Sequence, residues 1–144
     1  MSIIRTEMQA DAQEMLKLII ETADFQRAMA ELLSQENMTH ALFDIAKERE
    51  GFIEPFQQAV KSLGELPATP DADKEWIDEL RGKLTQLLSD DSKKAIFDKC
   101  LEKDEMLAEF INRTTLGEQS TEFKTLLDSL NDHLVKSKKR LSDS

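Results

Sequence analysis

Four polar residues interrupt runs of helically spaced apolar residues, each near the middle of a predicted helix. They are Thr22, Arg49, Asp104 and His133. If the four helices lie in register, these side chains share one buried polar layer. An ion pair between Arg49 and Asp104 would then fix the register of two helices, because a buried charge is tolerated only when it is paired.

Carboxylates near the same level offer a second interpretation, a metal or small-ligand site made of Glu21, Glu48, Asp104 and His133. Carboxylate oxygens and an imidazole nitrogen can bind divalent iron, manganese or zinc. Some pairing of charges is expected in either case. We favour the polar layer, with no cofactor, and keep the metal site as the alternative.

Other catalytic chemistry finds little support in the sequence. Cys100 is the only cysteine, and its apolar neighbours predict a buried small hydrophobe. A catalytic thiol would need a base, and only His40 and His133 could supply an imidazole. No serine lies in a nucleophile elbow and no glycine-rich loop could bind phosphates. We therefore do not expect an enzyme, although the sequence leaves that question open.

The elements that must position these residues are helices, because apolar residues recur with helical spacing almost throughout. Four long helices are predicted, at about 6–33, 37–63, 92–113 and 118–140, with a short crossover helix at about 73–88. Gly64 is predicted to cap the second helix, and the Pro55 ring to kink it near Gly51. Thr115 and Glu118 form a predicted capping box for the last helix.

The connections predict the topology of a single domain over residues 1–144. Helices joined by short loops run antiparallel, whereas a long crossover allows the second and third long helices to run parallel. The expected fold is therefore all-α, a four-helix bundle with ferritin-like connectivity and a short fifth helix in the crossover.

Charge and composition limit the partners. The chain has a net charge of −10, which disfavours nucleic acid and anionic membrane surfaces. The one dense basic run lies where cations favour the end of a helix: Lys136, Lys138, Lys139 and Arg140. The first eleven residues lack a continuous apolar segment and a cleavage site, so the expected location is the cytoplasm.

The sequence also resembles the small bacterial ferritin-like proteins grouped as a domain of unknown function. The resemblance is one of order, length and spacing over most of the chain. It is carried by Ala41-Leu42-Phe43, the helix end Val60-Lys61-Ser62-Leu63-Gly64, Trp76 in the crossover, and Ala95-Ile96-Phe97 leading to Cys100 and Asp104-Glu105.

This resemblance implies the ferritin-like fold, whose usual di-iron site takes a Glu-x-x-His motif from each of two helices. That motif is absent here. His40 is preceded at the required spacing by Asn37, and His133 by Leu130. A standard ferroxidase centre is therefore not expected.

The leading hypothesis is a non-enzymatic ferritin-like bundle of unknown or stress-related role that acts through a protein partner or through homo-oligomers. One alternative is a carboxylate-rich, metal-binding ferritin-like protein. Another is a small acidic chaperone or adaptor that holds an amphipathic helix in an apolar groove.

Overall fold

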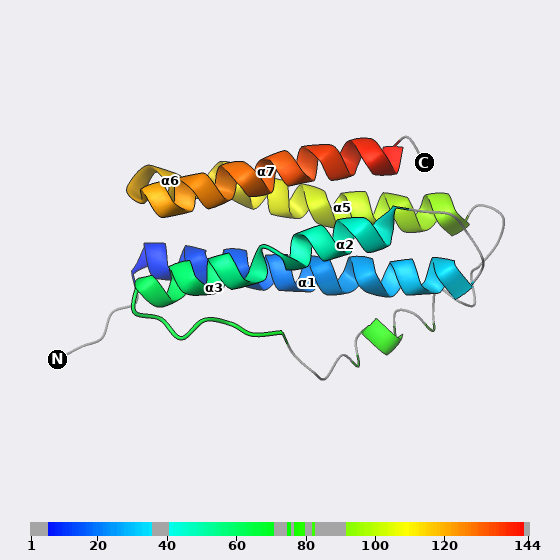
Figure 1. Cartoon of the computed structure of the whole chain (residues 1–144), viewed down its shortest axis with the longest axis horizontal. Helices are drawn as coiled ribbons and strands as arrows, with labels where there is room; N and C mark the ends of the chain where they lie inside the picture. Colours follow the sequence, from blue (N-terminus) through cyan, green and yellow to red (C-terminus); the bar gives the residue numbers. More distant parts are fainter. Residues whose placement is uncertain are drawn as a thin grey trace.

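Every regular element that the computed structural model describes is a helix, which confirms the all-α prediction (Figure 1). The structure describes residues 6–35, 41–70, 75, 77–79, 82 and 92–142. The helices are α1 (Glu7–Gln35), α2 (Leu42–Glu50), α3 (Ile53–Ser62), α5 (Ser92–Arg113), α6 (Leu116–Gln119) and α7 (Thr121–Ser142). None of these helices is long and apolar enough to cross a membrane.

The helices lie side by side in two opposite directions (Figure 1). Helix α1 runs the length of the molecule, and α2 followed by α3 runs back along it. Helix α5 starts at the opposite end from where α3 stops, so it runs in the same direction as α2 and α3. Helix α7 then returns beside α5, in the direction of α1.

The predicted long helix at 37–63 is divided in the structure, and its residues before 41 lie outside the described ranges. Helix α2 ends at Glu50, and the backbone N–H of the C-cap Gly51 donates to the carbonyls of Lys47 and Glu48. Pro55 offers no backbone N–H and its ring clashes with the carbonyl four residues earlier, which is that of Gly51. The interruption therefore falls where the proline predicts a kink, but it separates two helices.

The predicted helix at 118–140 is also different in the structure. The short helix α6 comes first, and Ser120 adopts an extended conformation before α7 starts at Thr121. Thr115 makes no side-chain capping bond, so the predicted capping box is wrong. The cap of α7 is Ser120, whose hydroxyl accepts a hydrogen bond from the N–H of Phe123 at 3.3 Å.

A capping box does occur at the start of α1. The Thr6 hydroxyl accepts the N–H of Gln9 at 3.0 Å, and the Gln9 side chain accepts the N–H of Thr6 at 2.9 Å. Two of the backbone donors left free at this helix end are thereby satisfied.

Glutamine side chains hold the start of the crossover against α1 and α3. Gly64 has φ +84°, a left-handed conformation that suits its predicted role as a helix cap. The Gln13 amide then donates to the carbonyl of Leu66 and accepts from the N–H of Ala68, both at 2.7 Å. Gln57 donates to the Ala68 carbonyl at 3.1 Å. Side-chain amides thus hold the backbone of Leu66 and Ala68 in place.

The predicted crossover helix at about 73–88 is described only in part. Residues 75, 77–79 and 82 are helical, and the others lie outside the described residues. Ile77 is buried and belongs to an apolar cluster with residues of α1, α2 and α5.

The buried apolar residues form two clusters along the bundle. One joins the first half of α1 to α3, the second half of α5 and the first half of α7. The other joins the second half of α1 to α2, the first half of α5 and the end of α7. Each long helix therefore passes from one cluster to the other near its middle.

Candidate functional site

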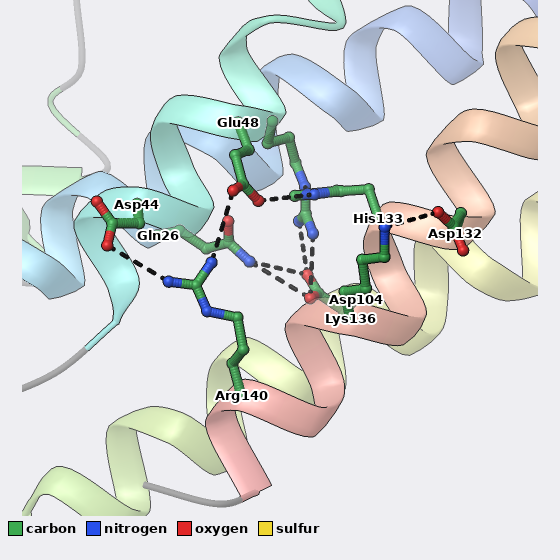
Figure 2. A network of polar contacts seen from close by, with 9 residues as sticks. Gln26, Asp44, Glu48, Asp104, Asp132, His133, Lys136 and Arg140 are labelled. Carbon is green, nitrogen blue, oxygen red and sulfur yellow. Dashed lines mark hydrogen bonds and ion pairs between the residues drawn. The ribbon is translucent and has the colours of Figure 1, made fainter.

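Buried polar side chains occupy the level between the two apolar clusters. Four of them are joined in one network, and each comes from a different helix: Gln26 from α1, Arg49 from α2, Asp104 from α5 and His133 from α7 (Figure 2). We call these four residues the polar layer. Thr22 of α1 and Ser137 of α7 are also buried.

The strongest contact in the polar layer is a two-point ion pair between Arg49 and Asp104. Arg49 Nη1 donates to Asp104 Oδ1 at 2.6 Å, and Nη2 donates to Oδ2 at 3.1 Å. The arginine side chain is fully buried and the aspartate nearly so. Gln26 Nε2 adds a further donor, 3.1 Å from Oδ1. The carboxylate is therefore neutralised and its lone pairs are largely used.

His133 extends the network on the other side of Arg49. Arg49 Nε donates to His133 Nε2 at 3.2 Å, so this ring nitrogen is an acceptor. We infer that the neutral ring carries its proton on Nδ1, which lies 3.5 Å from Glu48 Oε2. Burial lowers the pKa of His133 from 6.5 to about 4, with help from the positive charges of Arg49 and Arg140.

The network reaches solvent through Glu48. This side chain is 56% exposed and lies 3.6 Å from Arg140 of α7, which also contacts Asp44 at 3.3 Å (Figure 2). A second surface pair on α7 joins Lys136 to Asp132. Surface pairs of this kind contribute little to stability, so the energetic weight lies in the buried part.

The structure brings only some of the predicted site residues together. Arg49, Asp104 and His133 meet in the polar layer, as in the first interpretation. Thr22 is buried, but its hydroxyl donates to the Ile19 carbonyl of its own helix at 3.2 Å. Glu21 is exposed beside a different groove, between α1 and α5.

The proposed metal ligands are therefore not gathered around one point. Of the candidates Glu21, Glu48, Asp104 and His133, two are exposed, and the Asp104 carboxylate is already engaged by Arg49 and Gln26. Among the described residues, no three His, Cys, Asp or Glu side chains are placed to hold a metal ion.

Sequence reasoning missed Gln26. This side chain is fully buried, and while Nε2 donates to Asp104, Oε1 finds no donor among the described residues. The available signal was its position one helical turn after Thr22, on the same buried face.

The polar layer contains no activated nucleophile. Cys100 is fully buried close by, and burial raises the pKa of its thiol, with a further contribution from Asp104. A thiol held in its neutral form is a poor nucleophile. In the described residues, the layer's donors and acceptors are directed mainly at one another, which suits a structural role better than catalysis.

Grooves occur on the outside of the bundle. One of about 340 Å³ lies between α1 and α5, and one of about 210 Å³ lies between α5 and α7. Apolar side chains lie exposed in both, Met106 in the first and Val135 in the second.

No protein-family model, curated protein or solved structure matches this chain. The resemblance to ferritin-like proteins therefore stays a prediction.

Proposed function

We propose that this chain is a non-enzymatic helical bundle that acts by associating with another protein chain. One observation carries the proposal: the polar groups at the centre bind one another, whereas the apolar grooves open to the outside. Apart from Gln26 Oε1, the polar atoms of this centre are used by one another, which leaves little capacity to bind a ligand. Concave grooves lined by apolar side chains are the shape in which a helix of a partner protein binds.

The proposal includes ferritin-like connectivity and a role that is unknown or stress-related. The parallel course of α5 with α2 and α3, after a long crossover, supports the connectivity (Figure 1). The resemblance implies the fold and does not supply the role, because a fold does not fix a function.

The association can be tested with the purified full-length chain and with its source cells. Light scattering after gel filtration measures self-association, and cross-linking of the tagged chain in cells followed by quantification measures partner stoichiometry. We expect either a stable oligomer or one partner at a constant ratio. A monomer without any stoichiometric partner would contradict the proposal.

The proposal also assigns no resident metal to the centre. The support is the pairing of Asp104 with Arg49 and Gln26, which leaves few free ligand atoms. Iron, manganese and zinc can each be added in slight excess, removed by desalting and measured by elemental analysis. One retained equivalent per chain, lost in an Asp104→Asn variant, would support the metal-binding alternative instead.

A further inference from the structure

The groove between α1 and α5 is long enough to receive a helix. Its lining on α1 extends from Glu14 to Phe25, and two hollows within it share Leu18 and Met106. The eleven steps along the helix from Glu14 to Phe25 rise about 16 Å, or about three turns. The floor is apolar, because Leu18, Phe25, Met106 and Phe110 face it. Met106 is 54% exposed in the middle.

The lining of this groove carries three carboxylates and two cations, a net charge of −1. Glu14, Glu21 and Glu109 line it and make no ion pair with another described residue. The two cations in the groove are turned onto aromatic rings. Lys103 Nζ lies 5.7 Å from the centre of the Phe25 ring, and the Arg113 guanidinium lies 5.0 Å from that of Phe110. The rim is therefore negative in sum, in a chain whose net charge is −10.

We propose that this groove binds a basic amphipathic helix from a partner protein. Apolar residues of that helix would cover Met106 and Leu18, and flanking Lys or Arg side chains would pair with the three carboxylates. This is helix-in-groove recognition, with apolar anchors one turn apart. The inference rests on the proposed function and adds to it the surface and the class of partner.

The groove between α5 and α7 differs from this one in the net charge of its lining. It also exposes an apolar side chain, Val135, at 60%. The exposed charges on its lining, Glu105 and Lys138, cancel, and Asp104 is already paired with Arg49. Its net charge is therefore zero, against −1 for the groove between α1 and α5, so it attracts a basic helix less and supplies a matched control surface.

The test measures binding of a labelled model helix to the full-length chain by fluorescence anisotropy. The probe is a peptide of about 18 residues with a leucine face and a lysine face, long enough to be helical when bound. A scrambled peptide of the same composition and a leucine–glutamate peptide serve as probe controls. We expect only the amphipathic basic peptide to bind at micromolar concentrations, and more weakly in high salt.

Two variants with the same added charge locate the site. Met106→Asp and Val135→Asp each replace an exposed apolar side chain by a carboxylate, so their long-range attraction for the peptide is equal. We expect Met106→Asp to weaken binding about tenfold or more and Val135→Asp to leave it within about twofold. The triple variant Glu14→Gln, Glu21→Gln, Glu109→Gln should weaken binding and reduce its salt dependence. Circular dichroism checks that each variant is folded.

Several outcomes would overturn the inference. The first is that Met106→Asp and Val135→Asp bind the basic amphipathic peptide with the same affinity. The second is that the scrambled peptide binds as well as the amphipathic one, and the third is that the triple variant binds the peptide as the unchanged chain does. A stoichiometric partner found in cells whose cross-links avoid α1 and α5 would remove the groove assignment while leaving the proposed function intact. A second copy of this chain in the groove, found as a dimer lost in Met106→Asp, would also overturn it.

Discussion

The ion pair between Arg49 and Asp104 makes a sharp prediction about stability. Asp104→Leu removes the carboxylate and leaves a guanidinium that is fully buried and cannot lose its proton. Breaking a buried pair in this way costs about 3–5 kcal/mol. A domain with a typical stability of about 5–15 kcal/mol loses a large part of it. Far-UV circular dichroism during urea unfolding measures the loss.

Replacing the other partner, in Arg49→Met, should lower the free energy of unfolding less than Asp104→Leu does. Arg49→Met leaves a buried carboxyl group, which can become neutral by binding a proton. Its cost should therefore shrink as the pH is lowered, whereas the cost of Asp104→Leu should not. This asymmetry distinguishes a charge effect from a packing effect, because a lost packing contact does not depend on pH in this way.

Replacing the whole polar layer separates stability from specificity. The variant Gln26→Leu, Arg49→Met, Asp104→Leu, His133→Leu removes every donor and acceptor of the network together. Apolar replacements of buried ion networks are often neutral, or more stable by about 1–4 kcal/mol. We expect the same here. A cost of Asp104→Leu below about 1 kcal/mol, or a whole-layer variant as unstable as Asp104→Leu, would refute the reasoning.

Three further predictions concern pH, the crossover and a turn. The pKa of His133 is about 6.5 in the unfolded chain and about 4 in the fold. The free energy of unfolding is therefore highest above pH 6.5 and falls by about 3 kcal/mol as the pH drops to 4. His133→Gln, which keeps an acceptor for Arg49, should flatten that part of a urea-midpoint-against-pH curve. Gln13→Leu should lower the free energy of unfolding by about 1–3 kcal/mol. It should also speed hydrogen exchange at the Ala68 N–H, which donates to the Gln13 side chain. Gly64→Ala should lower the unfolding free energy by about 1–2 kcal/mol, because φ is +84° there; calorimetry can measure it.

The periodicity of the sequence predicts the helices but not their ends. Helical spacing of apolar residues is a strong signal, and the Pro55 ring correctly locates the break at Gly51. The start of α7 could not be chosen from the sequence, since Thr115 and Ser120 are both plausible caps. Packing decides between them: Leu116 is buried, so the chain makes the separate turn α6 before Ser120.

The sequence identifies residues of the candidate site only where they are charged and interrupt an apolar stripe. Arg49 and Asp104 stand out because a charged residue in an apolar stripe demands a partner. Gln26 does not stand out, since glutamine is common on the exposed face of a helix. The orientation of His133, with Nε2 toward Arg49 and Nδ1 toward Glu48, depends on how three helices meet. No sequence spacing contains that information.

The position of the polar layer explains why such an arrangement is useful. It separates two apolar clusters that could otherwise pack in more than one register, since apolar contacts have little directionality. A slip of α5 by one turn would move Asp104 about 5.4 Å, beyond hydrogen-bond reach of Arg49, and would leave both charges buried and unpaired. That penalty is of the same size as the loss expected for Asp104→Leu. The layer therefore penalises the wrong registers more than it stabilises the right one, and it keeps α1 and α5 aligned as the two walls of the outer groove.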